Sequence, residues 1–442
     1  MLAALHNPMV KGEALVGYGR VPTPGTDLPR FGNFLPGFPY LISDDVSGRF
    51  VPEEAPVKIV VALLSLVLAM PATALDVRIH PGQDGIYQYE VDARRGLSTV
   101  LIQNLAILQQ DGQPVRLTDV SINLRAGDRV RQVLRFDRAD LTTTAGQMAA
   151  LQKAGVLDLY DFAFQRRQYL GEKTGLASSE TVAAGTALIM SSIPLLVSRG
   201  VDSMRIVARG TDPEGKLVEA SVDIPLLQRE QRIEYGFPLR GAWLVAVGPG
   251  LSEPHRWALN EEFALDLVRI GASGTTCRRD CTKLADYAGW GADVVAAAGG
   301  DVVSTVTDQK ETAERLRKPS ESSDAFLKRT MAEQQQLLAR GAAGVVGNSV
   351  VIRHEGGEYS LYAHLAEGSV TVKAGEKVRK GQRIEKLGQT GNSTEPHLHF
   401  GIMDGPDPLY ARSLPVRFSG LTTMDGPQPP VFVQSGWIVE AR

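Results

Sequence analysis

The segment LGQTGNSTEPHLHF, residues 387–400, is the most informative part of this chain. It joins a glycine-rich stretch to the sequence His-Leu-His at 397–399 and an apolar run. Side chains alternate between the faces of a strand, so His397 and His399 share one face and Leu398 lies on the other. Two imidazoles about 7 Å apart along a strand can divide their roles, one binding a metal ion and the other facing a substrate.

A carboxylate elsewhere in the second half of the chain would complete such a metal site. A catalytic zinc ion takes three protein ligands and leaves its fourth position to water. Asp266 is the best candidate, because it sits in the apolar run 262–268, where an unpaired charge would be costly. A hydrogen-bonded structural aspartate is the alternative. Five of the seven histidines also lie in this half: His255, His354, His364, His397 and His399.

Six segments of the second half resemble, in order and spacing, the lysostaphin-type (LytM-type) zinc metallopeptidases, which are peptidoglycan endopeptidases. The resemblance implies that Asp266 and His399 bind Zn²⁺ and that His364 and His397 form the catalytic pair. Hydrogen-bonded structural histidines are the alternative for both members of that pair. The six segments are residues 287–291, 293–303, 347–354, 359–365, 378–382 and 387–400.

The first zinc ligand is where the sequence departs from the family pattern. The common form H-x-x-x-D would place a histidine at position 262, which is Glu262 here. A variant form with the histidine farther upstream favours His255, and we expect His255 to be the ligand. Glu262 as the ligand, or an incomplete site, are the alternatives. We expect His354, which precedes a glycine-rich turn, to be an ordinary strand-end residue.

The fold class is expected to be mainly β, with two units. Alternating apolar residues between turn signals predict an Ig-like β-sandwich over residues 75–239. Within it, a Pro-Gly turn at 212–215 predicts a hairpin over 203–224, and residues 145–156 are expected to form one short helix. A β-rich metallopeptidase domain is expected over 240–419, followed by a C-terminal tail, 420–442. Helix-forming composition predicts a helical hairpin inserted at 308–341, either a surface elaboration or a lid.

The beginning of the chain is expected to lie outside both units. Residues 57–74 have a basic residue, a short apolar run and a small-residue end, which is typical of a secretion signal. The apolar run is too short to span a membrane, and a buried core helix is the alternative. Residues 1–56 are expected to be a non-native or disordered extension, with Val57 standing for the true initiator.

Composition is that of a globular protein and gives no sign of a nucleic-acid partner. Hydrophobic residues make up 43% of the chain, and 47 basic residues nearly balance 50 acidic ones. The two cysteines, Cys277 and Cys281, are expected to form a disulfide in an oxidising compartment, with a zinc-binding pair as the alternative.

Together these features predict an exported, periplasmic or extracellular zinc endopeptidase that hydrolyses peptide cross-links of peptidoglycan. The mature chain is expected to have no membrane span. A non-catalytic relative that binds cell wall or activates an amidase is the alternative, and a zinc peptidase that acts on proteins is a third possibility.

Overall fold

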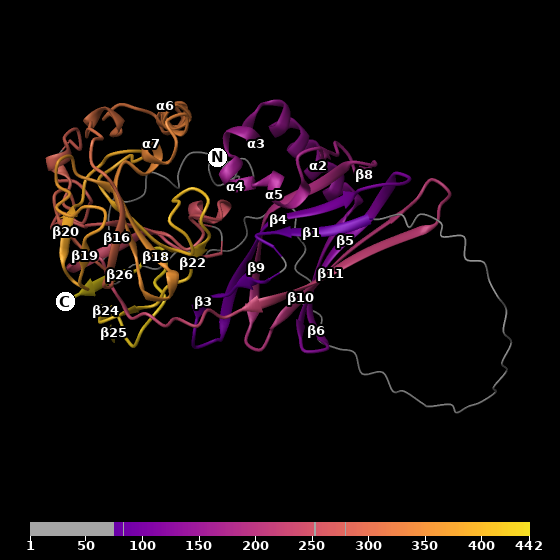
Figure 1. Cartoon of the computed structure of the whole chain (residues 1–442), viewed down its shortest axis with the longest axis horizontal. Helices are drawn as coiled ribbons and strands as arrows, with labels where there is room; N and C mark the ends of the chain where they lie inside the picture. Colours follow the sequence, from indigo (N-terminus) through magenta and orange to yellow (C-terminus); the bar gives the residue numbers. More distant parts are fainter. Residues whose placement is uncertain (1–74, 83, 252, 279) are drawn as a thin grey trace. The chain divides into compact units, whose positions relative to one another are not determined.

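Strands dominate the part of the chain that the computed structural model describes, which is residues 75–442 without 83, 252 and 279 (Figure 1). The expected mainly β fold is confirmed. The expected extension, 1–56, and the expected signal segment, 57–74, lie outside the described residues. Within the described range, none of the helices combines the length and the apolar character needed to span a membrane.

Residues 75–227, here called the first β unit, contain two largely antiparallel sheets. Its hydrophobic core takes side chains from both sheets, among them Val100 and Ile206, so the sheets face each other across that core. One sheet contains β1 (Leu75–His80), β3 (Tyr89–Asp92), β4 (Leu97–Gln109), β7 (Gly175–Leu176) and β9 (Thr186–Ser198). The other contains β2 (Ile86–Tyr87), β5 (Val115–Ala126), β6 (Arg129–Asp137), β8 (Thr181–Val182), β10 (Ser203–Thr211) and β11 (Leu217–Leu227).

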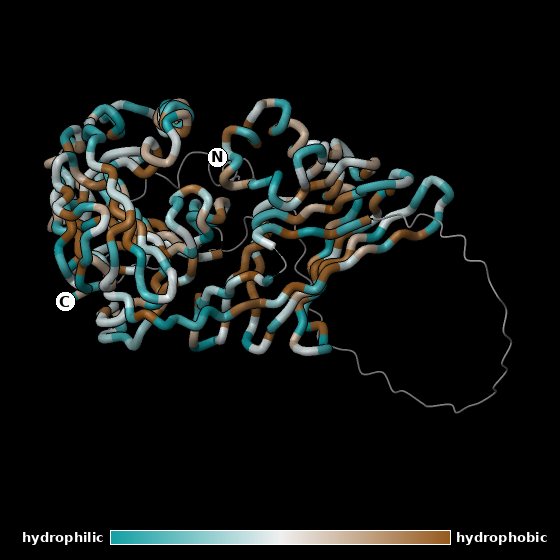
Figure 2. The backbone as a smooth tube through the Cα atoms, in the orientation of Figure 1, coloured by the Kyte–Doolittle hydropathy of each residue, from teal (hydrophilic) through white to brown (hydrophobic). Residues whose placement is uncertain are grey.

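The hairpin of β10 and β11 has the turn that its sequence predicts. Ser203 pairs with Pro225 and Thr211 with Leu217, so the strands are antiparallel along their length. Gly215 adopts a φ of +80°, which favours glycine, and Lys216 donates its backbone N–H to the Asp212 carboxylate at 2.8 Å. Figure 2 shows hydrophobic residues concentrated along the strands.

Helices connect β6 to β7, where the sequence predicts one helix near residues 145–156. The main helix, α2 (Arg138–Lys153), begins earlier because Asp137 and Asp140 form a capping box around its first turn. The Asp137 carboxylate accepts the backbone N–H groups of residues 139 and 140. Three short helices follow: α3 (Val156–Leu159), α4 (Asp161–Phe164) and α5 (Arg166–Leu170).

Residues 235–442, here called the second β unit, are built around one large sheet. Its central strands run in the order β17, β18, β21, β14, β13 and β26, all antiparallel to their neighbours. The sheet comprises β13 (Gly241–Val247), β14 (Leu265–Val268), β16 (Gly300–Val306), β17 (Asn348–Arg353), β18 (Tyr359–Leu365), β19 (Lys377–Val378), β21 (Leu398–Met403), β22 (Ser413–Leu414), β24 (Leu421–Thr423), β25 (Gly426–Pro427) and β26 (Ile438–Ala441).

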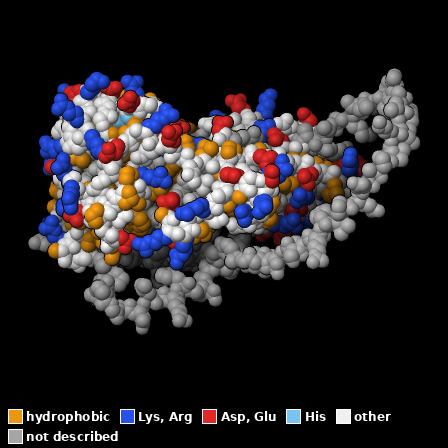
Figure 3. All heavy atoms as spheres, turned by 90° about the horizontal axis from the view of Figure 1, so that it is seen from below, with side chains coloured by type: hydrophobic (Ala, Val, Ile, Leu, Met, Phe, Trp, Pro, Cys, Tyr) orange, Lys and Arg blue, Asp and Glu red, His pale blue; other side chains and the backbone are white. Residues whose placement is uncertain are grey.

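Smaller elements complete this unit. Two short ribbons pair β12 (Tyr235–Gly236) with β23 (Phe418–Ser419) and β15 (Asp293–Val295) with β20 (Arg383–Lys386). Single 3₁₀ turns are η2 (Pro254–Trp257), η3 (Leu284–Asp286), η4 (Ala313–Arg315) and η5 (Glu355–Gly357). Figure 3 shows positive and negative side chains interspersed on the face in view, with no large area of one sign.

Both ends of the second unit differ from the expected boundaries. Tyr235 and Phe237 belong to its hydrophobic core, so the unit begins before residue 240. The expected tail, 420–442, instead contributes strands: β26 pairs with β13, and Val439 is fully buried. The alternation of exposed and buried residues in β26 is a strand signal, but the segment is too short to stand out in the sequence.

The expected helical hairpin at 308–341 is wrong in its first arm. Only η4 forms there, because the Arg315 side chain turns inward and donates to the Ser393 carbonyl and the Asn392 side chain. Tertiary contacts thus override the local helix propensity. The second arm is α6 (Ser323–Leu338), capped by Ser322, and α7 (Ala342–Val346) follows it.

Glu385 is a buried acid in β20 whose two carboxylate oxygens have no hydrogen-bond partner among the described residues. Burial raises the pKa of this carboxyl well above its usual value of 4.5. The folded state therefore favours the neutral acid, and the protein should lose stability as pH rises from 4.5 towards the pKa of the folded state.

We predict that Glu385→Gln becomes more stable relative to the unmodified protein as pH rises, by about 1.4 kcal/mol per pH unit in that range. Urea unfolding between pH 4 and 8 measures this slope. Glu214→Gln, at an exposed position, is the control, and its stability relative to the unmodified protein should not show this slope. A stability difference that does not vary with pH would mean that Glu385 is ionised in the folded protein.

Candidate metal centre

The register of two neighbouring strands places Asp266 and His399 side by side. Asp266 in β14 pairs directly with His399 in β21, and its Oδ1 lies 3.0 Å from the His399 Nδ1. Residues directly opposite each other on antiparallel strands have neighbouring side chains. The backbone ladder of the sheet therefore fixes the distance between these two groups.

His255 reaches the same carboxylate from a turn rather than a strand. It lies in η2, and its Nε2 is 3.1 Å from the Asp266 Oδ2. Its Nδ1 faces the Ala264 carbonyl at 3.3 Å, so the ring is oriented from its far side. One ligand atom each from His255, Asp266 and His399 lie within 4.8 Å of one another.

These three residues fit a zinc ion by their chemistry and arrangement. Zinc binds imidazole nitrogen and carboxylate oxygen, and three protein ligands are the usual set of a catalytic site. His255 would bind through Nε2, because its Nδ1 is hydrogen-bonded to the backbone. His399 would bind through Nδ1, the nitrogen that faces Asp266.

The Asp266 carboxylate favours positive charge around itself. Burial alone would lower the pKa of His255, but Asp266 outweighs burial and raises that pKa to about 9. Burial would raise the pKa of Asp266, but His255 and His397 hold it well below its usual range. A negative charge in this largely buried position therefore needs a cationic partner, whether a proton or a metal ion.

His397 and His364 lie beside this group with one ring nitrogen each held by the backbone. The Nδ1 of His397 is 2.8 Å from the Glu395 carbonyl, and the Nδ1 of His364 is 2.9 Å from the Thr390 carbonyl. Each Nδ1 therefore carries the hydrogen that it donates, which leaves Nε2 as the nitrogen that can accept a proton. The two ring centroids are 4.7 Å apart.

The pKa values of the His364 and His397 rings are shifted in opposite directions. Burial, together with nearby His397 and His399, holds the pKa of His364 well below its usual value, so His364 is neutral near pH 7. Burial also opposes the charge of His397, but Asp266, 3.4 Å from its Nε2, outweighs burial and raises its pKa. One neutral and one readily protonated imidazole thus lie together.

His364 also has an unusual backbone, with a φ of +61°. A non-glycine residue in the left-handed region costs roughly 1–3 kcal/mol and is often found at functional sites. The conformation comes near the end of β18, where the strand pairing with β17 is irregular. Sequence reasoning identified the residue, but no local signal predicted this backbone.

Glu262, the alternative first ligand, forms a different interaction. Its carboxylate pairs with the Arg256 guanidinium at 3.0 Å, and both side chains are only 2% exposed. His354 also lies apart from the metal centre: it is buried between the Gly299 carbonyl and the Ser360 hydroxyl. Sequence reasoning missed Arg256, although its place next to His255 could have drawn attention to it.

Glu395 and Gly401, which flank the His-Leu-His motif, occupy different surroundings. The Glu395 carboxylate accepts a hydrogen bond from the Thr276 hydroxyl at 3.1 Å, and burial raises its pKa. Thr276 directly precedes Cys277, which forms the expected disulfide with Cys281. Gly401 faces Ala264, where an added Cβ would make an ordinary 3.5 Å contact with the alanine side chain.

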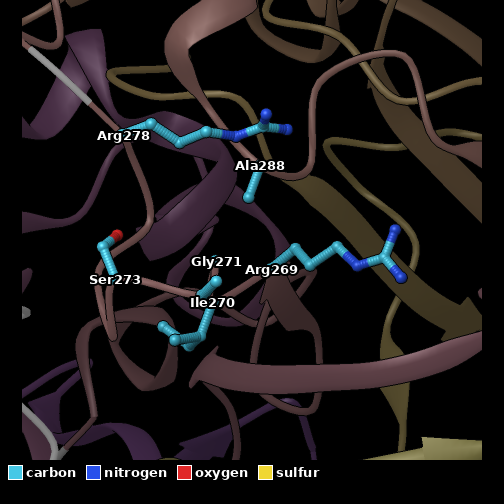
Figure 4. Close-up of a pocket in the computed structure, with 7 residues that line it drawn as sticks. Arg269, Ile270, Gly271, Ser273, Arg278 and Ala288 are labelled. Atoms are coloured by element: carbon cyan, nitrogen blue, oxygen red, sulfur yellow. The ribbon is translucent and has the colours of Figure 1, made fainter.

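A pocket of about 500 Å³ lies on the loop that follows β14 (Figure 4). Arg269 and Arg278 extend in the same direction from its lining, with Ala288 between them. The Arg269 guanidinium lies 5.5 Å from the centre of the Trp243 ring. The residues that line the pocket do not include any of the metal-centre residues. They are Arg269, Ile270, Gly271, Ala272, Ser273, Arg278 and Ala288.

Residues 332–410 match the model of Peptidase family M23. The chain contains a family M23 peptidase domain. The matched residues include three of the site histidines, His364, His397 and His399. His255 and Asp266 precede the matched segment: the β14–β21 register places Asp266 beside it, and η2 carries His255.

Named relatives share this M23 region. The DD-carboxypeptidase/endopeptidase Mpg of Neisseria meningitidis is 40% identical over 86 residues, which are 20% of this chain and 19% of that protein. The peptidoglycan DD-endopeptidase ShyA of Vibrio cholerae is 43% identical over 65 residues, 15% of each chain. The similarity thus spans about a fifth or less of the length of these relatives.

Among solved structures, the catalytic domain of lysostaphin from Staphylococcus simulans is similar at 17% identity. The alignment covers 41% of this chain and 88% of that chain, with a TM-score of 0.21.

We predict that Asp266→Ala, His399→Ala and His255→Ala each lose zinc, because each removes one of the three expected protein ligands. The loss of affinity should exceed the roughly 10–100-fold effect of changes in outer-shell residues. Metal content after dialysis against buffered zinc measures it. Asp301→Asn, which removes a carboxylate paired with Lys377 on another strand, is the control. Stoichiometric zinc in His255→Ala would show that the first ligand is another residue.

Proposed function

We propose that the chain is a zinc-dependent endopeptidase that hydrolyses peptide cross-links of bacterial peptidoglycan. The observation that carries the proposal is that three expected metal ligands, His255, Asp266 and His399, lie together. The rings of His364 and His397 lie beside them. The M23 match and the endopeptidase names of the relatives support the same reaction class.

A bound zinc ion would supply Lewis acidity, which polarises a carbonyl group and makes water a stronger nucleophile near neutral pH. His255, Asp266 and His399 would hold it. Their positions follow from the β14–β21 register and from η2, so the protein organises the ligands before a substrate arrives.

His364 and His397 would move protons during hydrolysis. The neutral His364 ring can accept a proton at Nε2 from the attacking water, as a general base. His397, whose pKa is raised, can donate from Nε2 and stabilise negative charge on the carbonyl oxygen of the scissile bond. The backbone carbonyls of Thr390 and Glu395 keep both rings oriented for these roles.

Action on cell-wall peptides requires the protein to reach the cell wall, so we propose that it is exported to the periplasm or the extracellular space. The disulfide between Cys277 and Cys281 supports this location, because disulfides persist in oxidising compartments. The non-catalytic alternative is not favoured, because four of the five expected positions are unaltered and His255 lies where it can serve as the fifth.

We predict that His364→Ala and His397→Ala each reduce peptide release from purified peptidoglycan by at least about 100-fold, while zinc stays bound. General acid–base groups contribute typically 10²–10⁴-fold. Mass spectrometry of released muropeptides gives the rate, and metal analysis gives the zinc content.

The control is His80→Gln, which changes a buried histidine of the first β unit that bonds to Gln165. It should retain both rate and metal. Wild-type rates in either catalytic variant would contradict the assigned roles. A zinc-loaded, unmodified chain that releases no peptide would favour the non-catalytic alternative.

A further inference from the structure

His255 is the one proposed ligand that no strand holds. Asp266 and His399 lie on paired strands, whereas His255 belongs to the four-residue turn η2. A short turn has few backbone hydrogen bonds of its own, so its position depends on what packs against it. The neighbours of η2 come largely from the first β unit.

The Trp257 side chain, two residues after His255, anchors η2 in an apolar cluster whose buried residues come mostly from the first unit. Its ring meets Tyr160 edge-on, with centroids 5.4 Å apart, and Phe162 at 5.8 Å. The adjacent Ala258 is fully buried in the same cluster, which also includes Ala106 from β4. Such aromatic contacts define both the distance and the orientation of the turn.

A buried ion pair beside His255 extends this contact. Arg256 and Glu262, called here the Arg256–Glu262 clamp, are each 2% exposed and lie 3.0 Å apart. The Arg256 guanidinium also donates to the Thr99 hydroxyl of β4 at 2.8 Å and to the Gly250 carbonyl. Charges this deeply buried are stable only when well paired, so the pair has little freedom to move.

Gln103, also in β4, contacts both halves of the clamp. Its side-chain amide donates to the Arg256 backbone carbonyl at 3.1 Å and lies 3.5 Å from the Glu262 carboxylate. Arg256 of the clamp directly follows His255 in the chain. Glu262, the other member, lies two residues before Ala264, whose carbonyl faces the His255 ring. The clamp thus fixes both segments that orient this ligand.

We propose that the first β unit is a structural part of the metal centre. Thr99 and Gln103 hold the Arg256–Glu262 clamp, and the clamp positions His255 for metal binding. These four are positioning residues, since none of them is a proposed ligand. The inference rests on the proposed function for the identity of His255 as a ligand. It gives the first β unit a specific role that sequence analysis left open.

The test compares two pairs of substitutions in the full chain. Thr99→Val with Gln103→Leu removes the polar contacts of β4 and keeps side chains of similar size. Arg256→Met with Glu262→Met removes both charges of the clamp together, which avoids leaving one buried charge unpaired. The control, Arg229→Met with Glu358→Met, removes a largely buried ion pair that links the segment after β11 to the second unit and adjoins no proposed ligand.

The readouts are the zinc dissociation constant by chelator competition, the visible spectrum of the cobalt-substituted protein, and the thermal midpoint without metal. Both test pairs should weaken zinc binding roughly 10-fold or more and alter the cobalt spectrum. The control should change the midpoint alone. Either test pair is sufficient if the other does not fold.

Unchanged zinc affinity and cobalt spectrum in the folded test variants would overturn the inference, as would an equal loss in the control. An unmodified chain that binds no zinc would instead refute the proposed function, and this separates the two failures.

Discussion

The buried carboxylate of Asp266 is the feature on which the rest of the site depends. A negative charge with only 18% of its side chain exposed is costly unless cationic groups surround it. His255, His397 and His399 all lie within 3.4 Å of its oxygens. The same electrostatic demand that gathers these imidazoles would favour a divalent metal ion.

The fold satisfies this demand with two kinds of support. The antiparallel ladder of β14 and β21 fixes Asp266 and His399, so the sheet itself sets two of the three proposed ligands. The remaining histidines are held by contacts of single groups: backbone carbonyls orient His364 and His397, and η2 carries His255. Sites on strands are held more firmly than sites on turns, which is why His255 needs support from outside its own unit.

Sequence reasoning was most successful where the signal was local. The mainly β fold, the β10–β11 hairpin and the disulfide followed from alternation, a turn motif and cysteine spacing. It failed where distant contacts decide the structure. Arg315 turns inward to bond with residues 392 and 393, which prevents the expected first helix of the insertion. The strand β26 exists because β13 pairs with it. The Arg256–Glu262 pair bonds to β4, more than a hundred residues away in the chain, so no local pattern could predict it.

X-ray absorption at the zinc edge of the full, zinc-loaded chain identifies the ligand atoms of the bound metal ion. We predict one zinc ion per chain, bound by two imidazole nitrogens and by oxygen ligands at about 2.0–2.2 Å. Sulfur in the coordination shell would contradict this prediction, because that would assign the metal to Cys277 and Cys281. A chain that retains no zinc would contradict it as well.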